Sequence, residues 1–403
     1  MSKNILYLCP SFPYPADSGG KVVFLNHINF LKRNGFKVHV VFLDVDGNAS
    51  NLQIKQLNIH GFESYQVFTR TVPRINNLKT LLTSLFYFFF KKWPRAYTAR
   101  MSTELQDYVS SLLTAYRFDH VLFDHFTAFA FIKNFKTLRE LNVVYIAHNV
   151  ESKVLADQYK LNRNTIKRMF YYTEYIKTKC VEKEILANTA VTITISSEDK
   201  GILQKGFAIG GIIKNIPEIL PLQNDLWKYK PGKNILFVGG IDYYPNYDAV
   251  DWIVFKLMPE LIKIDESIIC TIVGNADGLK QKNLPANIVF TGRISDDDLE
   301  YLYKSANLFI SPVVLGSGIK VKVLTALSYC IPLLCTKESM HGIDYIENQE
   351  RLIFGRNSLS HAVSKVMALL NDKNNQTQVS SLIEENMKKS LKAISDKWNL
   401  NND

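Results

Sequence analysis

The chain has 403 residues, of which 47% are hydrophobic and 21% are charged, and its formal net charge is +10. This length exceeds one ordinary core, so two domains are expected, and the composition is that of a soluble globular protein. All of the excess charge lies in residues 1–200, which hold 26 Lys and Arg against 16 Asp and Glu. This asymmetry favours an acidic partner for the first half, either nucleic acid or an anionic membrane surface.

Cysteine usage and apolar runs narrow the class of protein further. Five cysteines form no C-x-x-C pair, which favours reduced, buried thiols over a disulfide framework. No signal peptide is expected, because residues 1–4 lead directly into a short apolar strand. The longest apolar run, residues 81–90, is about half of what spans a bilayer. We therefore expect a cytoplasmic protein that is not integral to a membrane.

Apolar segments typical of strands alternate with helical patterns, which predicts parallel sheets built from βαβ units. Strands are expected at residues 4–10, 37–44, 120–125, 142–149, 190–197, 234–240, 267–274, 287–292, 307–312 and 331–336. Helices between them include residues 21–34, 249–262 and 296–305. The pattern predicts an α/β protein with two doubly wound domains, 1–215 and 216–378, an exposed loop near 371–377, and a C-terminal helix over 379–403 that returns towards the first domain.

The segment 308–336 joins a buried strand to a helix, expected over 319–329, through a small-residue loop. The loop consists of Gly316, Ser317 and Gly318, and Lys320 and Lys322 lie near the helix start. Glycines let backbone N–H groups close on an anion, and the N-terminus of a helix adds partial positive charge. The segment therefore predicts a phosphate-binding site.

Other candidates also follow strands, where open α/β sheets bind ligands, and with two domains the default site is the cleft between them. Gly19 and Gly20 stand at a helix entrance, but they lack the G-x-G-x-x-G spacing of a nicotinamide or flavin site. His148 leaves a central strand and suits a contact to a sugar hydroxyl or a reacting group, with helix capping as the structural alternative. The Asp-His pair at 124–125 is interpreted as mainly structural.

Two further strand ends carry candidate binding residues. Gly239 and Gly240 follow the first strand of the second half and open backbone N–H groups. Arg293 and Ile294 follow the strand at 287–292, in a position suited to holding a planar base. The acidic run at 296–298 is expected to start a helix, where negative charge complements the dipole, so no metal site is expected.

Together these segments resemble glycosyltransferases of GT-B fold, in particular the large retaining group often called family 4. The resemblance covers most of the chain: C-P-S-F-P-Y-P-A-D-S-G-G at 9–20, H-N-V-E-S at 148–152, F-V-G-G-I-D-Y-Y-P-N at 237–246 and S-P-V-V-L-G-S-G-I-K-V-K-V-L at 311–324. It implies two Rossmann-like domains facing a cleft, the first on the acceptor side and the second binding a nucleotide-sugar. It also implies that the nucleotide-sugar is a substrate and that no cofactor is needed.

The resemblance assigns roles residue by residue. Gly19 and Gly20 match the pair that lies against the donor diphosphate, His148 matches the histidine that reaches the donor sugar, and Lys322 matches the lysine that pairs with the diphosphate. His148 and Lys322 are thus the expected catalytic residues. The other expected donor-binding residues are Gly239, Gly240, Arg293, Ile294, Gly316, Ser317, Gly318, Lys320 and Thr325.

One departure from the family pattern concerns the ribose. The family usually has two glutamates eight residues apart, and this chain has Ser317 and Thr325 instead. A single hydroxyl replaces a carboxylate, and losing a charged acceptor costs about 1.5–3 kcal/mol. The alternative that the chain is a non-catalytic GT-B protein, acting as a partner of a glycosyltransferase, therefore stays open. A sugar-nucleotide epimerase is a weaker alternative, because no matching acidic pair is found.

Residues 70–100 form a basic and strongly apolar segment, with seven aromatic residues, seven cations and no acidic residue. This suits a helix on an anionic membrane, while packing of residues 81–90 inside the domain is the alternative. A second basic stretch, residues 160–179, adds to the same interpretation. No nucleic-acid partner is expected, because no recognised module is evident.

The expected function is therefore that of a metal-independent, retaining hexosyltransferase-type enzyme. It moves a sugar from a nucleotide-sugar to a glycan or lipid-linked saccharide in bacterial surface polysaccharide biosynthesis. The expected location is cytoplasmic and peripheral, at the inner membrane face.

Overall fold

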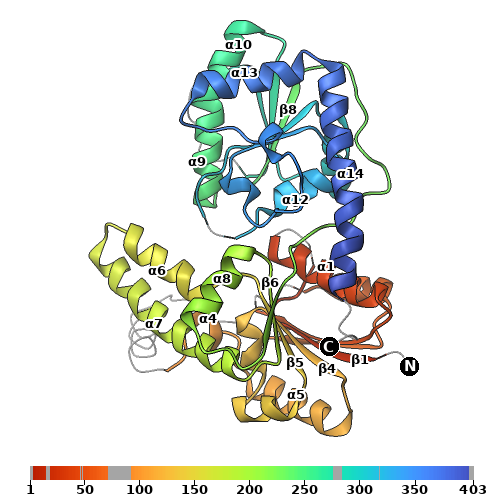
Figure 1. Cartoon of the computed structure of the whole chain (residues 1–403), viewed down its shortest axis with the longest axis vertical. Helices are drawn as coiled ribbons and strands as arrows, with labels where there is room; N and C mark the ends of the chain where they lie inside the picture. The colour runs from red at the N-terminus through yellow and green to blue at the C-terminus, as the bar shows by residue number, and fades with distance from the viewer. Residues whose placement is uncertain are drawn as a thin grey trace. The chain divides into compact units, whose positions relative to one another are not determined.

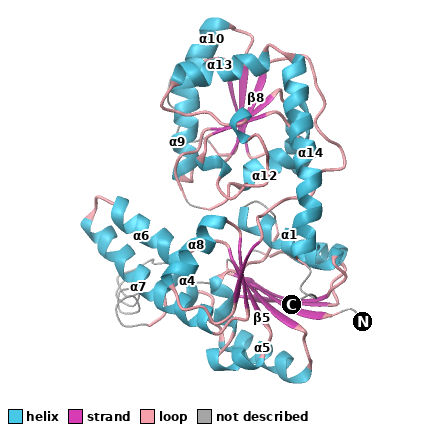
Figure 2. Ribbon diagram, in the orientation of Figure 1, coloured by secondary structure: helices cyan, strands magenta, loops and turns pink. Residues whose placement is uncertain are grey.

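The structure is a computed structural model that describes residues 3–14, 19–45, 47, 49–70, 92–275, 284–316 and 318–398. The chain divides into two compact units, unit 1 (Met1–Ile216 with Lys397–Asp403) and unit 2 (Pro217–Asp396). Each unit contains one parallel sheet with helices on both of its sides (Figure 1) (Figure 2). The predicted α/β fold with two doubly wound sheets is confirmed. In the described part of the chain, no helix combines the length and apolarity needed to cross a bilayer.

Unit 1 has a seven-stranded sheet in the order β3-β2-β1-β4-β5-β6-β7. Its strands are β1 (Asn4–Cys9), β2 (Lys37–Asp44), β3 (Ser64–Thr69), β4 (His120–Asp124), β5 (Val143–Ala147), β6 (Val191–Thr194) and β7 (Ile212–Asn215). Its helices are α1 (Gly19–Arg33), α2 (Asn51–Gln56), α4 (Arg95–Thr98), α5 (Thr103–Ala115), α6 (Glu151–Leu161), α7 (Thr165–Ala187) and α8 (Ser197–Gly206). Because β1, β4 and β5 are neighbours, residues that follow them emerge at the same edge of the sheet.

Unit 2 has a five-stranded sheet in the order β10-β9-β8-β11-β12. Its strands are β8 (Asn234–Val238), β9 (Ile269–Val273), β10 (Ile288–Gly292), β11 (Leu308–Ser311) and β12 (Leu333–Cys335). Its helices are α9 (Tyr244–Trp252), α10 (Met258–Ile264), α11 (Asp296–Ser305), α12 (Val321–Ser328), α13 (Leu359–Leu370) and α14 (Lys373–Lys397). The last residue of α14 and the chain beyond it belong to unit 1.

Two helices differ from the sequence-based expectation. The helix expected over 249–262 starts at Tyr244 and contains a π-helical segment, Ile253–Leu257, between α9 and α10. Pro259, the second residue after this segment, lacks an N–H group, which disturbs the regular hydrogen-bond ladder. The exposed loop expected near 371–377 is wrong, because α14 begins at Lys373. The expected start of the predicted acidic helix is confirmed, with Ser295 accepting the backbone N–H of Asp298 at 3.1 Å.

The cysteines also differ in part from expectation. All five are free thiols, and four of them are buried as predicted. Cys180 on α7 is exposed, because it lies on the outer side of an amphipathic helix whose opposite side enters the core.

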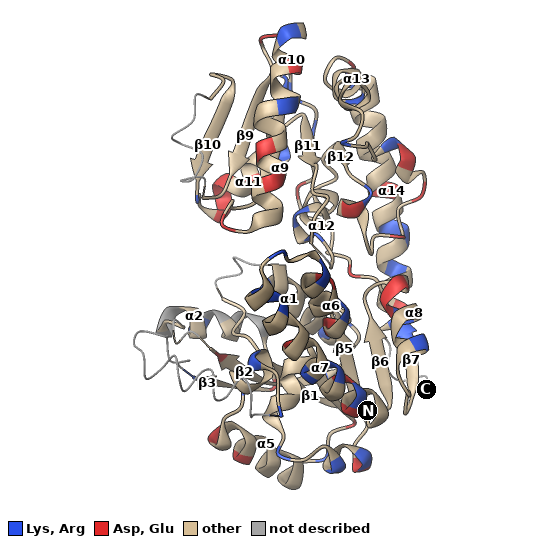
Figure 3. Cartoon of the chain, turned by 90° about the vertical axis from the view of Figure 1, so that its left-hand side faces the viewer, with Lys and Arg blue, Asp and Glu red and all other residues tan. Residues whose placement is uncertain are grey.

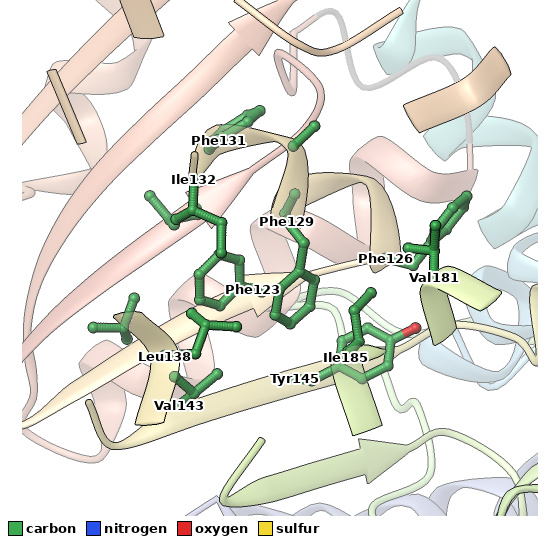
Figure 4. Close-up of a cluster of buried hydrophobic side chains, with 14 of the residues drawn as sticks. Phe123, Phe126, Phe129, Phe131, Ile132, Leu138, Val143, Tyr145, Val181 and Ile185 are labelled. Atoms are coloured by element: carbon green, nitrogen blue, oxygen red, sulfur yellow. The ribbon is translucent and has the colours of Figure 1, made fainter. Parts of the chain in front are cut away.

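A cluster of buried rings supports the strand ends of unit 1 (Figure 4). Phe123 of β4 stacks on Phe129 with ring centroids 4.0 Å apart, and Tyr145 of β5 meets Phe129 edge-on at 5.4 Å. The Tyr97 hydroxyl donates to the Phe129 carbonyl at 2.8 Å, so the polar end of that ring is satisfied. Fully burying one such ring contributes about 1.5–3 kcal/mol. The packing therefore fixes Phe123 and, with it, the next residue, Asp124.

Candidate functional site

Asp124, the last residue of β4, is the centre of a buried polar cluster in unit 1. Its side chain is fully buried and accepts hydrogen bonds from the Tyr7 hydroxyl, from Nδ1 of His27 at 2.8 Å and from Nε2 of His148. We call Tyr7, His27, Asp124 and His148 the histidine cluster. Burial alone would raise the pKa of the Asp124 carboxyl, but His27 and His148 outweigh burial and hold it below its usual range. Asp124 is therefore a carboxylate that orients two imidazoles.

The contact with Asp124 determines how His148 is held. His148 follows β5, and its side chain is 11% exposed, whereas Asp124 is fully buried. In the neutral ring, Nε2–H donates to the carboxylate, which leaves Nδ1 as the hydrogen-bond acceptor. The Phe24 ring lies 5.2 Å from the His148 ring and restricts it from the side of α1. His148 is thus a positioned imidazole with a defined tautomer.

His125 lies beside this cluster in an unusual backbone conformation. Its φ is +79°, a region that non-glycine residues rarely occupy. Its Nδ1 contacts the Thr127 hydroxyl at 2.8 Å, and its Nε2 contacts the Glu151 carboxylate at 3.1 Å. Burial lowers the pKa of His125, and the hydrogen bond that its Nε2–H donates to the Glu151 carboxylate opposes this only in part. The Asp-His pair, predicted to be mainly structural, positions its neighbours: Asp124 holds His148, and His125 contacts Glu151 at the start of α6.

The end of the chain packs on the histidine cluster from within unit 1. The Trp398 ring lies 5.1 Å from the His27 ring and stacks on Phe30 at 6.3 Å. Both His27 and Trp398 are buried, at 1% and 2% exposure. Trp398 thus shields the side of the cluster that α1 contributes.

Gly19 and Gly20 begin α1, directly after residues 15–18, which lie outside the described part. A Cβ added at Gly20 would approach Phe24 only to 4.0 Å, an ordinary contact. The fold itself therefore has room for a side chain at Gly20. The sequence predicts that glycine stands here so that a bound ligand can approach the backbone, and this stays a prediction.

In unit 2, Gly239 and Lys322 come together although they are far apart in the sequence. A Cβ at Gly239 would lie 2.6 Å from Nζ of Lys322 and 2.8 Å from Nδ2 of Asn246, so a side chain here would displace both, and the φ of +153° favours glycine. The Asn246 amide donates to the Gly240 carbonyl at 2.9 Å, and its Oδ1 accepts from Lys322. We call Gly239, Gly240, Asn246 and Lys322 the lysine pocket.

Lys322, the second residue of α12, has an unusual environment for an ammonium group. Its Nζ lies 4.4 Å from the centre of the Phe237 ring, and among the described residues no carboxylate forms an ion pair with it. Burial, assisted by nearby Lys320, lowers the pKa of Lys322 to about 7. A cation that is desolvated without a negative partner at a helix start is suited to receive an anion.

Lys320 and the glycine loop form a separate arrangement. The Lys320 ammonium donates to the carbonyls of Gly316 and Gly318, each at 2.9 Å, and burial lowers the pKa of Lys320 to about 8. Gly316 and Gly318 have φ of +83° and +76°, which favours glycine at both positions. Lys320 therefore holds the loop closed, while Ser317 between the two glycines lies outside the described residues.

The residues expected to hold the nucleoside are less closely joined. The Thr325 hydroxyl donates to the Val321 carbonyl at 3.0 Å, one turn back in α12. Arg293 is exposed and Ile294 is half-buried, and both follow β10 at the edge of the sheet, two strands from β8. The structure thus joins Lys322 with Gly239 but shows no contact between this pair and Arg293 or Ile294 among the described residues.

Sequence reasoning missed Tyr7 and His27 as functional candidates and undervalued Asp124. Tyr7 lies in the middle of a strand and His27 in the middle of a helix, where both look like core residues. A polar residue on the buried face of α1 was the available signal, since His27 faces inwards with Val23, Phe24 and Ile28.

Comparisons with known proteins bear on the family and the fold of the chain. Residues 232–372, within unit 2, match the family described as Glycosyl transferases group 1. The chain is similar to an uncharacterized 44.6 kDa protein in the cps region of Klebsiella pneumoniae, with 21% identity over 89% of this chain and 91% of that protein.

Solved structures show the same architecture. The sucrose-phosphate synthase of Thermosynechococcus elongatus superposes with a TM-score of 0.65 at 14% identity, covering 98% of this chain and 97% of that one. A TarM mutant of S. aureus, solved with fondaparinux, alpha-GlcNAc-glycerol and UDP, superposes with a TM-score of 0.68 at 12% identity, covering 98% of this chain and all of that one. The protein therefore has the GT-B fold of these glycosyltransferases. Its C-terminal unit matches the glycosyl transferases of group 1, as the motifs of the sequence imply.

Proposed function

We propose that the protein is a retaining, hexosyltransferase-type glycosyltransferase that uses a nucleotide-sugar donor without a metal ion. The observation that carries the proposal is the lysine pocket, in which the desolvated Lys322 amine at the start of α12 lies beside the Gly239 backbone and has no ion-pair partner among the described residues. A nucleoside diphosphate supplies the missing negative charge. The family match of residues 232–372 and the UDP named with the TarM neighbour support this choice of ligand.

The two units contribute different chemistry to this proposal. When the glycosidic bond to the diphosphate breaks, negative charge develops on the leaving phosphate, and Lys322 stabilises it electrostatically. In unit 1, Asp124 holds His148 in one tautomer, and we assign the donor sugar to this imidazole. The resemblance adds Gly19 and Gly20 to the diphosphate contacts.

We propose a glycan acceptor, lipid-linked in the biosynthesis of a bacterial surface polysaccharide. The relative from the Klebsiella pneumoniae cps region supports this context. An inner membrane face is the corresponding location. The segment 70–100, to which we assign membrane contact, lies mostly outside the described residues, which omit 71–91.

A screen of nucleotide-sugars tests the function. Thermal unfolding is measured with UDP-, GDP-, ADP- and CMP-sugars, and each stabilising donor is then tested for sugar transfer or slow donor hydrolysis. We expect one base to raise the Tm and to support turnover. Absence of stabilisation by every donor would contradict the proposal.

A non-catalytic GT-B protein that assists a transferase is the second candidate, and Thr325 favours it. The usual carboxylate is missing, and the Thr325 hydroxyl is already bonded to the Val321 carbonyl. Thr325→Glu is expected to tighten nucleotide binding about tenfold or more, because a carboxylate accepts charge-assisted hydrogen bonds from a ribose diol. Thr325→Val, which keeps the shape and removes the hydroxyl, is the matched control and should leave the affinity unchanged. Donor binding without turnover in the wild type would support this second candidate.

A further inference from the structure

The tip of the hairpin formed by α6 and α7 exposes large apolar side chains. We define the hairpin tip as residues 158–173, which includes the end of α6, the connecting turn and the start of α7. Within it, Leu161 is 77% exposed, Ile166 75%, Met169 51% and Tyr172 49%. Exposed apolar side chains of this size, gathered on one short segment, indicate a surface that binds a membrane or another protein.

The same tip carries only positive charge. Residues 158–173 contain four cations and no acidic residue. These cations are Lys160, Arg163, Lys167 and Arg168, and all four are exposed. Figure 3 marks the Lys and Arg positions of α6 and α7 in blue. Apolar side chains interleaved with cations, and tyrosines beside them, are typical of a surface that enters an anionic lipid headgroup region.

Hydrogen bonds of α7 hold the two helices of the hairpin together and join the hairpin to α4. Buried Glu174 of α7 accepts the backbone N–H of Arg95 at 2.8 Å, and buried Glu182 accepts that of Ser152 at 3.2 Å. These contacts tie α7 to the starts of α4 and α6, and the hairpin extends away from the seven-stranded sheet (Figure 1). At the tip itself, Asn164 caps α7 by accepting the Lys167 N–H at 3.0 Å. The exposed side chains are therefore presented on an ordered element.

We infer that the hairpin tip is a membrane-docking surface that binds an anionic bilayer. This rests on the proposed function only for the choice of the inner membrane face, and it is independent of residues 70–100. A second copy of the chain fits poorly, because a symmetric contact would place four cations against four cations. Nucleic acid also fits poorly, since Leu161 and Ile166 have no role against a phosphate backbone.

The test uses the full chain with a reporter at the tip. Leu161→Trp is mixed with vesicles of phosphatidylcholine alone or with phosphatidylglycerol, carrying brominated acyl chains that quench a tryptophan inserted among them. We expect added quenching relative to the wild type with the anionic vesicles only. Tyr116→Trp is the matched control, because Tyr116 is 59% exposed on another part of unit 1, and it should show none.

Charge-reversal variants distinguish binding through the hairpin tip from a general electrostatic attraction of the protein to the membrane. Arg163→Glu with Lys167→Glu should weaken binding to anionic vesicles by about fivefold or more for each charge removed. Lys136→Glu with Arg117→Glu, exposed elsewhere in unit 1, changes the net charge equally and should have a smaller effect. If the protein floats with anionic vesicles but Leu161→Trp shows no added quenching, the inference is overturned. The proposed location at the membrane would then stay intact. Dimerisation that the tip substitutions abolish would also overturn it, whereas quenching in a protein without transferase activity would contradict only the proposed function.

Discussion

Asp124 connects residues that are far apart in the chain, since Tyr7, His27 and His148 come from β1, α1 and the end of β5. A fully buried carboxylate is costly unless it is hydrogen-bonded, and here three donors satisfy it. One of those donors is the imidazole of His148, for which the family resemblance predicts a catalytic role. Asp124 is therefore a positioning residue, and its charge and geometry both matter.

Asp124→Asn tests that role because asparagine keeps the shape and loses the charge. Hydrogen bonds to a charged group are worth about 1.5–3 kcal/mol, so turnover is expected to fall about tenfold to a hundredfold. Steady-state kinetics should show the loss in kcat more than in KM for the donor. In combination with His148→Ala, Asp124→Asn should cost little more, because both act through one imidazole. Additive losses would indicate a purely structural role.

The pKa of Lys322 predicts how pH affects ligand binding. In the empty pocket burial lowers this pKa to about 7, so the amine is mostly neutral at pH 8. A bound diphosphate favours the charged form and raises the pKa, so binding takes up a proton. Affinity is therefore expected to fall as pH rises above 7, by up to about tenfold per pH unit.

Calorimetric titration at pH 8 checks this sign directly. Heats of binding measured in HEPES and in Tris should differ by the buffers' ionisation enthalpies for an uptake approaching one proton. The Lys322→Met variant should lose the difference. An affinity that is flat between pH 7 and 9 would be inconsistent with Lys322 as the anion-binding group.

At the scale of elements, α7 contains a buried carboxyl with an altered pKa. Burial raises the pKa of Glu182 to about 8, against 4.5 for an ordinary glutamate. Unfolding between these pH values releases a proton, so the free energy of unfolding should decrease as pH rises from about 5 to 8. Glu182→Gln removes this titration, and the variant should gain stability relative to the wild type as pH rises.

Urea unfolding at pH 5.5 and pH 8 measures that change. Glu184→Gln is the matched control on the same helix, because Glu184 is 39% exposed and pairs with Lys92 at the surface. The control should differ from the wild type equally at both pH values. A pH-independent effect of Glu182→Gln would refute the raised pKa.

Most of the strands that the sequence predicts correctly are largely buried, although the partly exposed edge strand β10 was also predicted. Strands such as β1 and β4 are continuous apolar runs, because helices cover both sides of a parallel sheet. The two edge strands of unit 1, β3 and β7, were not among the expected strands. Both are largely exposed or half-buried, so their sequences lack the apolar signal.

The residues of the candidate site also differ in how readily the sequence predicts them. Positions that directly follow strands, such as Gly239 and His148, are readable from the chain because parallel strands end at one edge. The bond between His27 and Asp124 joins residues 97 positions apart, and it depends on which face of α1 is buried. The apolar pattern of α1 indicates that His27 faces the core, but no local pattern identifies Asp124 as its partner. The contact between Lys322 and Gly239 likewise requires the packing of α12 against β8.

At the scale of the whole molecule, the chain consists of two units, each with one parallel sheet and its own proposed roles. Unit 1 holds the histidine cluster and the docking hairpin, and unit 2 holds the lysine pocket. The excess positive charge of residues 1–200 belongs to unit 1. This distribution of residues agrees with the proposal that unit 1 contacts an acceptor at a membrane and that unit 2 binds the nucleotide donor.

The most direct test of the account is the affinity of the nucleoside diphosphate for Lys322→Ala. UDP, GDP and ADP are titrated into the wild type, into Lys322→Ala and into Lys263→Ala, a control that changes an exposed lysine of α10. We predict that one diphosphate binds the wild type and Lys263→Ala equally. Lys322→Ala should bind it at least tenfold more weakly and turn over on the order of a hundredfold more slowly. Equal binding and turnover by all three proteins would contradict the central claim.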